Sequence, residues 1–213
     1  MPVGNGNMAH QQKSHDEIPV RLFQNAFLER LTQVSFQTFI SVWSVVLAVV
    51  LIVDARHSHS AGSFILDTGI GLAIWFVMEY LLHRFLFHLR LRSDMGQKLI
   101  FLIHGNHHLQ PNHPLRNLMP LSVSVPLGAA VWGIGVLTGG MATGGSIAGG
   151  FILGYVGYDI VHYACHQFPM KLSVLRAIKK HHIQHHCVEP EANFAITAIF
   201  LDRVFGTKLR RGQ

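Results

Sequence analysis

The chain has 213 residues, which suits a single domain. Hydrophobic residues make up 49% of it and charged residues only 13%, whereas soluble domains carry about a quarter charged residues. The apolar residues also occur in long runs, so the composition excludes an ordinary soluble domain and predicts an integral membrane protein. The formal net charge is +6, but the basic residues flank apolar runs and are not interleaved with aromatic residues, so no nucleic-acid partner is expected.

The first 33 residues are predicted to form an N-terminal tail and a helix outside the membrane. Residues 1–17 look disordered, and Met1 to Lys13 is too polar for a signal peptide. From Ile18 to Gln33, apolar residues recur at helical spacing between charged residues. This pattern predicts either an amphipathic helix on the membrane surface or an ordinary solvated helix. Residues 34–213 are then the membrane domain.

Four apolar segments are predicted to cross the membrane as helices, at about residues 34–53, 64–89, 121–137 and 147–168. The second is longer than the ~30 Å hydrocarbon core requires, so its last turns should emerge into water. The Gly-rich stretch 139–145 is predicted to be a tight turn and not a phosphate loop, because no Lys follows it. All Lys and Arg residues except Arg56 lie on one side of this topology, which predicts that this side, with both termini, is cytoplasmic.

Histidine is unusually frequent, with 16 residues, and most of them fall in four short windows: His83–His88, His104–His108, His162–His166 and His181–His186. The second and fourth windows contain the spacing i, i+3, i+4, which places three imidazoles on one helical face. His162 and His166 form an i, i+4 pair. His83 and His88 diverge by about 140° on a regular helix, so they either serve different metals or straddle a distorted turn.

Crowded imidazoles repel one another when protonated and need hydrogen-bond partners when neutral. A metal ion removes both difficulties, because it binds the neutral rings. The clusters therefore predict a metal site, and three or more histidines per ion predict two ions. Asp159 lies one turn before His162 and is predicted to hold a metal-bound water or to fix an imidazole tautomer, unless it is a plain interfacial anion. Glu79 is predicted either to bond the His83 ring or to pair elsewhere. His113 is not counted as a ligand.

The four windows have the forms HX4H, HX2HH, HX3H and HX2HH, and this series resembles the fatty acid hydroxylase / sterol desaturase superfamily. The resemblance is greatest to fatty acid 2-hydroxylases, and it covers about residues 64–207. It is carried by EYLLHRFLFH (79–88), HGNHHLQP (104–111), YDIVHY (158–163), KHHIQHH (180–186) and a tail ending in DRVFGT (202–207).

The resemblance implies ten metal-binding histidines: His83, His88, His104, His107, His108, His162, His166, His182, His185 and His186. It implies that Asp159 holds water at the metals and that His181, as an eleventh histidine, supports the ligands from outside. Glu79 remains a further candidate for such a supporting role. The fold would be all-α, with four membrane helices under a cytoplasmic helical cap that carries the dimetal site. The metals would be two iron ions that use O2 to hydroxylate a lipid acyl chain at position two, next to its carbonyl group, with zinc possible in purified protein.

Two departures from the family pattern bear on this expectation. His113 stands where relatives commonly have an acidic residue, and the chain has no room for a fused cytochrome b5 domain. A separate electron donor is therefore expected, either cytochrome b5-like or a ferredoxin with its reductase. A sterol or carotenoid hydroxylase or desaturase is the alternative within the superfamily. A metal transporter or sensor is a distant alternative, because the third and fourth segments offer few polar groups at mid-membrane. We expect a bacterial inner membrane rather than the endoplasmic reticulum.

Overall fold

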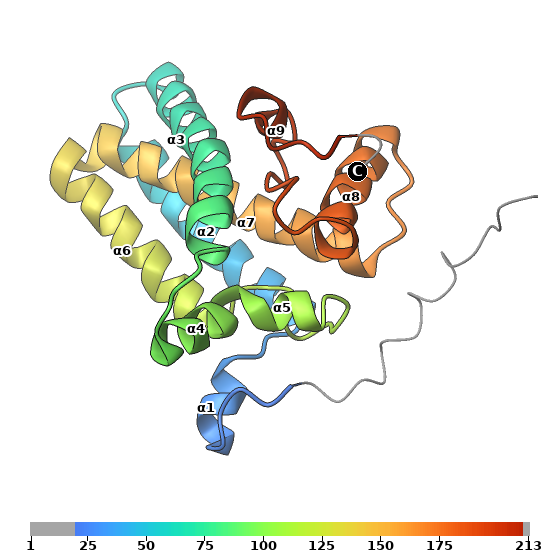
Figure 1. Ribbon diagram of the computed structural model, residues 1–213. Helices are drawn as coiled ribbons and strands as arrows, with labels where there is room; N and C mark the ends of the chain where they lie inside the picture. Colours follow the sequence, from blue (N-terminus) through green and yellow to red (C-terminus); the bar gives the residue numbers. More distant parts are fainter. Residues whose placement is uncertain (1–19, 211–213) are drawn as a thin grey trace, which may run out of the picture.

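The computed structural model describes residues 20–210, and every regular element in that range is a helix. Four long helices form a bundle: α2 (Phe36–His57), α3 (Ala61–Leu81), α6 (Leu121–Gly139) and α7 (Ser146–Gln167). The shorter helices lie beside this bundle: α1 (Ala26–Leu31), α4 (Asp94–Ile100), α5 (Asn106–Leu109), α8 (Ser173–Cys187) and α9 (Leu201–Val204) (Figure 1). Three π-helical segments complete the order: η3 (Leu82–Phe87), η4 (Phe101–Gly105) and η5 (Gly140–Gly145). The all-α fold class is confirmed.

Three helical stretches are long and apolar enough to cross a membrane: Phe36–His57, Ala61–Phe87 and Leu121–Gln167. They include the four segments predicted from the sequence, with ends that differ by up to four residues. Capping accounts for the differences at the starts of α2 and α3. Ser35 caps α2, and the reciprocal bonds of Ser60 and Ser63 start α3 at Ala61, three residues earlier than predicted. The membrane character of the chain is therefore supported by the lengths of its helices.

The third stretch contains α6, η5 and α7, and the chain turns back on itself within it. Gly140 has a φ of +73°, a conformation that favours glycine, at the point where α6 ends. After the turn the backbones lie so close that a Cβ on Gly135 would be 2.6 Å from the carbonyl oxygen of Gly144. The predicted glycine-rich turn is present, although it runs on into the π-helix η5.

Helices α3 and α7 approach each other closely along the middle of the bundle, and glycine permits the approach. A Cβ added to Gly71 would lie 1.9 Å from the carbonyl oxygen of Ile147, and one added to Gly150 would lie 2.0 Å from that of Thr68. Small residues at such crossings let membrane helices pack through their backbones. This contact matters for function because α3 leads into the first histidine window and α7 carries the third.

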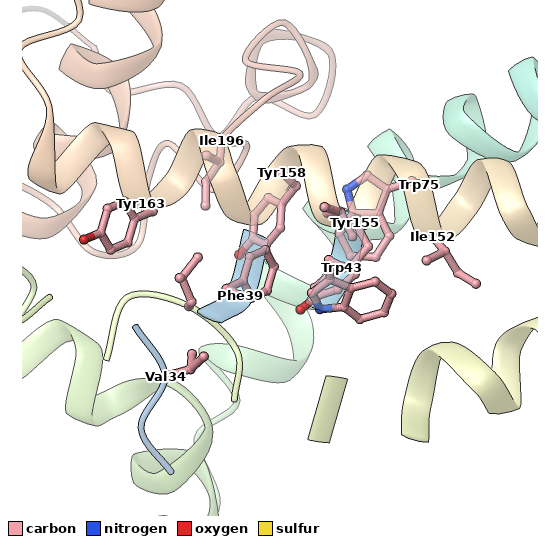
Figure 2. Close-up of a cluster of buried hydrophobic side chains, with 11 residues drawn as sticks. Val34, Phe39, Trp43, Trp75, Ile152, Tyr155, Tyr158, Tyr163 and Ile196 are labelled. Atoms are coloured by element: carbon pink, nitrogen blue, oxygen red, sulfur yellow. The ribbon is translucent and has the colours of Figure 1, made fainter. Parts of the chain in front are cut away.

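An aromatic cluster packs between α2, α3 and α7. Tyr155 of α7 packs edge-on against Trp43 of α2 and Trp75 of α3, with ring centroids 5.4 Å apart in both pairs. Figure 2 shows these rings together with Tyr158 and Phe39, and with Ile196 from the C-terminal region, which belongs to the same cluster. The core therefore joins three of the long helices to the region that follows α8.

The N-terminal segment is less helical than predicted. The tail lies outside the described residues, and the helix expected over 18–33 is formed only by α1. Two contacts explain the shorter helix. The Asn25 side chain caps α1, and the Glu29 carboxylate accepts hydrogen bonds from the backbone N–H groups of Leu22 and Phe23, which folds these residues back along α1.

Substitution of Gly71 by Ala tests the close contact between α3 and α7. Because the added methyl group would meet the backbone of Ile147, the helices must separate, and we expect a loss of roughly 1–3 kcal/mol in stability. The control is Gly69→Ala in the same helix, where a Cβ meets nothing within 4 Å. Thermal unfolding in detergent should show a lower midpoint for Gly71→Ala only; equal midpoints would contradict the packing argument.

Candidate metal centre

The ten histidines that the family resemblance implies as ligands converge in space as two groups of five. The first group consists of His83, His88, His104, His108 and His185, and the second of His107, His162, His166, His182 and His186. Within each group the candidate ligand atoms all lie within 4.8 Å of one another. Each group could therefore hold a metal ion, and each has side chains both from the long helices or their ends and from the shorter helices.

The two HX2HH windows are shared between the groups, which the spacing did not predict. We expected His104, His107 and His108 to occupy one helical face. His104 and His108 instead face the first group and His107 the second, because adjacent residues on a helix are turned by about 100°. The window on α8 divides in the same way, with His185 in the first group and His182 and His186 in the second. Helices α5 and α8 thus each contribute histidines to both groups.

In the first window a distorted helix brings together two histidines that are five residues apart. His83 lies in η3 and His88 directly after it, and a π-helix has hydrogen bonds from i to i+5. This brings residues five apart toward one face, and the two ring centroids are 5.0 Å apart. Of the two explanations that the sequence left open, the structure has the distorted turn, with both rings in one group.

Backbone carbonyls fix the tautomer of three of the histidines. Nδ1 of His83 lies 2.5 Å from the oxygen of Phe194, Nδ1 of His185 2.7 Å from that of Ala192, and Nδ1 of His162 3.0 Å from that of Asn117. A carbonyl can only accept, so each Nδ1 carries the proton. In a neutral ring the lone pair is then on Nε2.

These lone pairs point at other imidazoles. Nε2 of His83 lies 3.1 Å from Nε2 of His104, and Nε2 of His162 lies 2.9 Å from Nε2 of His107. Nitrogen lone pairs converging at such distances, with Nδ1–H bonded to a carbonyl behind them, form the donor set that transition metals occupy in proteins. The residues present therefore fit a metal ion in each group.

Burial keeps these rings neutral. It lowers the pKa of His104 and of His107 well below the usual value, and neighbouring histidines lower both pKa values further. The same two causes lower the pKa of His108 to about 3, while burial is the main cause that lowers the pKa of His185 to about 4. Neutral imidazole is the metal-binding form, so near neutral pH these rings need lose no proton before they bind an ion.

Asp159 lies beside the histidine groups on α7. Its Oδ2 accepts hydrogen bonds from the Tyr155 hydroxyl and from the backbone N–H of Met119, both at 3.0 Å. It lines a cavity of about 360 Å³ together with His107 and His162. A carboxylate in this place can accept a hydrogen bond from water in the cavity.

Glu79 and His181 make no direct hydrogen bond to the rings of the two groups. Glu79 does not bond His83, whose Nδ1 donates to Phe194; its carboxylate accepts instead from the backbone N–H groups of Ile196 and Thr197. His181 lies outside both groups and donates to Asp202 across 2.8 Å. Of the two roles considered for Glu79, pairing elsewhere is the one that the structure has.

The cavity joins the two groups. Its wall contains His104 from the first group and His107 and His162 from the second, with Asp159 beside them. Most of the remaining wall is apolar and comes from η3, η4, the start of α6 and the N-terminal segment, as shown by Phe87, Leu102, Ile103, Leu118, Val123, Leu22, Phe23, Leu28 and Leu31. An apolar chain can therefore lie against both groups of histidines with little water around it.

Several residues of the site were not found from the sequence. Arg116 lines the cavity and forms a buried ion pair with Glu29, with 2.5 Å between Nη2 and Oε1. The carbonyl partners of the histidines were also missed, and they have no sequence signal because every residue carries a carbonyl group. Asp202, the acceptor of the His181 hydrogen bond, did have a sequence signal, because it begins the DRVFGT motif that contributes to the family resemblance. His113 is buried but belongs to neither group.

These features define a helical membrane protein with two histidine groups that could each hold a metal ion beside an apolar cavity. The sequence profile of the fatty acid hydroxylase family matches residues 68–207, and the chain belongs to this family. The family predicted from the histidine windows is thus confirmed.

Relatives with assigned activities cover most of the chain. A dihydroceramide fatty acyl 2-hydroxylase of Arabidopsis thaliana is 32% identical over 96% of this chain and 88% of its own length. The human fatty acid 2-hydroxylase is 30% identical over 89% of this chain and 56% of its own length. The solved structure of full-length Scs7p, in which only the hydroxylase domain is visible, has a TM-score of 0.80 at 30% identity and covers 90% of this chain and 72% of that one.

Single substitutions in each group test the division of the histidines. His185→Ala removes a ligand from the first group and His107→Ala removes one from the second, so we expect each to lower the metal content from about two ions per chain to about one. His59→Ala, on an exposed loop, is the control and should leave the content unchanged. Elemental analysis of freshly purified protein gives the count; one ion or none in the folded wild type would contradict a two-metal centre.

Proposed function

We propose that this protein hydroxylates a lipid acyl chain at position two, with the two histidine groups each holding one iron ion. Membership of the fatty acid hydroxylase family supports the reaction. The observation that carries the proposal is the cavity, whose wall has histidines from both groups, Asp159 and otherwise mostly apolar side chains. Iron is favoured over zinc because hydroxylation of a C–H bond requires a change of oxidation state, which zinc cannot undergo.

The residues around the metals have three tasks. The histidines hold two ions, which when bound supply the activation of O2 with electrons from a separate donor, either cytochrome b5-like or a ferredoxin with its reductase. The apolar wall positions the alkyl chain and excludes water, which would otherwise quench a reactive oxidant. Asp159 accepts a hydrogen bond from water in the cavity and fixes its position beside His107 and His162.

The depth of the centre in the bilayer supports position two. His83 lies at the end of the second apolar stretch and His162 near the end of the third, so the metals sit close to the membrane interface. The polar end of a lipid lies at that depth, whereas a chain terminus lies ~15 Å deeper, at the midplane. The carbon next to the carbonyl group is therefore within reach. The name of the Arabidopsis thaliana relative favours an amide-linked acyl chain, as in dihydroceramide.

The chain is proposed to cross the membrane four times. A single helix over Leu121–Gln167 would be ~70 Å long, more than twice the hydrocarbon thickness, so α6 and α7 cross separately on either side of the turn at Gly140. Residues 34–213 then form the hydroxylase domain. Residues 1–33 are peripheral, with α1 on the membrane surface, where Phe27 and Leu28 are exposed.

The excess of basic residues on one side supports a cytoplasmic metal centre and cytoplasmic termini. The relatives come from plants, fungi and mammals, so they give no support to a bacterial inner membrane.

The orientation can be tested with a topology reporter. Fused after Gln213, the reporter should read as cytoplasmic because the basic side of the protein stays inside. Inserted between α2 and α3, next to Ser58, it should read as external. The opposite pair of readings would reverse the orientation, and a cytoplasmic reading at both sites would contradict four crossings.

The reaction can be tested by expression in a host without such an activity, supplied with iron and a reductase system. Mass spectrometry of total fatty acids and amide-linked lipids should show 2-hydroxy acyl chains, and His186→Ala should abolish them because the second group loses a ligand. His59→Ala is again the matched control. Unchanged acyl chains together with newly hydroxylated sterols or carotenoids would assign the protein to the alternative branch of the superfamily.

A further inference from the structure

A buried stretch of backbone after α8 contacts the first histidine group through its carbonyl groups. We call residues 192–197 the carbonyl loop; it has no helix or strand, and Ala195 and Ile196 in it are completely buried. Buried backbone N–H groups must find acceptors, because an unpaired one costs as much as a lost hydrogen bond. The partners of this loop therefore decide whether it can keep its place.

Asp202 of α9 accepts from two consecutive backbone groups of the carbonyl loop. Its Oδ1 lies 2.9 Å from the backbone nitrogen of Phe194, and its Oδ2 lies 2.8 Å from that of Ala195. The same carboxylate also accepts from His181 and from the Thr207 hydroxyl. Each oxygen of Asp202 therefore accepts one hydrogen bond from the backbone of the loop.

Glu79 of α3 accepts hydrogen bonds from the next two backbone N–H groups of the carbonyl loop. Its Oε1 lies 2.6 Å from the backbone nitrogen of Ile196 and 2.8 Å from that of Thr197, while its Oε2 accepts from the Thr197 hydroxyl. Four successive N–H groups of the loop are therefore held by two buried carboxylates. Glu79 uses only one of its oxygens for backbone groups, whereas Asp202 uses both.

The carbonyl groups of the same loop face the histidines. Ala192 accepts from Nδ1 of His185 and Phe194 accepts from Nδ1 of His83, and both rings belong to the first group. The Phe194 ring also packs against His88, with centroids 5.4 Å apart. In the second group the carbonyl bonded to a ring belongs to Asn117, which is far from the loop in sequence.

We infer that Glu79 and Asp202 are positioning residues for one metal only: through the carbonyl loop they set the first group and leave the second untouched. The inference rests on the proposed two-metal centre. Its chain of contacts runs from carboxylate to backbone N–H, along one peptide to a carbonyl oxygen, and from there to Nδ1 of a metal-binding ring. Loss of such outer partners typically lowers metal affinity by about 10–100-fold.

Asp202 uses both carboxylate oxygens for backbone N–H groups and Glu79 only one, so amide substitutions at the two positions should have different effects. Asp202→Asn must turn an NH2 group toward a backbone N–H, because both oxygens of Asp202 accept from the backbone. Glu79→Gln can keep its remaining oxygen on Ile196 and Thr197 and donate its NH2 to the Thr197 hydroxyl. Asp202→Asn and Glu79→Ala should therefore release the first ion, whereas Glu79→Gln should retain it.

Elemental analysis of the purified full-length protein is the first measurement. We expect about two ions per chain in the wild type and in Glu79→Gln, and about one in Asp202→Asn and Glu79→Ala. Combination with a ligand substitution identifies the group that is lost. Asp202→Asn with His185→Ala should still keep about one ion, because both changes empty the first group, whereas Asp202→Asn with His107→Ala should keep about none.

Hydrogen exchange at residues 194–197 is the second measurement and does not depend on metal. Exchange should be faster in Asp202→Asn and Glu79→Ala and unchanged in Glu79→Gln, and circular dichroism should show that helix content is retained. Equal loss of both ions in Asp202→Asn, or a Glu79→Gln protein that behaves like Glu79→Ala, would overturn the inference. A wild type with fewer than two ions would contradict the proposed function instead, while the exchange rates would still test the loop.

Discussion

A histidine can offer Nε2 to a cation only when its proton is held on Nδ1, and backbone carbonyls impose this condition on three rings of the protein. The carbonyls belong to buried, non-helical backbone around Asn117 and in the carbonyl loop. Such backbone persists only if its own N–H groups are paired, which Glu79 and Asp202 achieve at the carbonyl loop. The two histidine groups thus depend on segments that contribute no histidine to either group.

The membrane bundle supplies the second constraint. Helices α3 and α7 pack backbone to backbone at Gly71 and Gly150. This contact sets how the two helices are positioned along each other, and with them the windows that begin at His83 and His162. The two windows go to different groups, so the close helix contact also sets how far apart the groups are. The aromatic rings of Trp75 and Tyr155 then keep the same two helices from rotating, because large rings packed edge to face have few alternative arrangements.

The sequence was sufficient to predict the helices and the histidines that converge, because apolar length and spacing are local signals. It could not assign His107 and His108 to different groups, since residues i, i+3 and i+4 all count as one face until the positions of both neighbouring helices are known. The π-helix at His83 was one of two open explanations, because no residue type marks such a segment. The partner of Glu79 depends on a loop more than a hundred residues away, which periodicity cannot detect.

The N-terminal segment shows how tertiary contacts override a correct local pattern. Its apolar residues recur at helical spacing, yet Leu22 and Phe23 leave the helix and line the cavity. Glu29 accounts for both facts, because one of its oxygens holds the N–H groups of these two residues and the other receives Arg116, whose side chain is only 2% exposed. A buried ion pair is costly to break from one side, so this contact keeps the segment against the cavity. The segment therefore forms part of the cavity wall that faces the histidines.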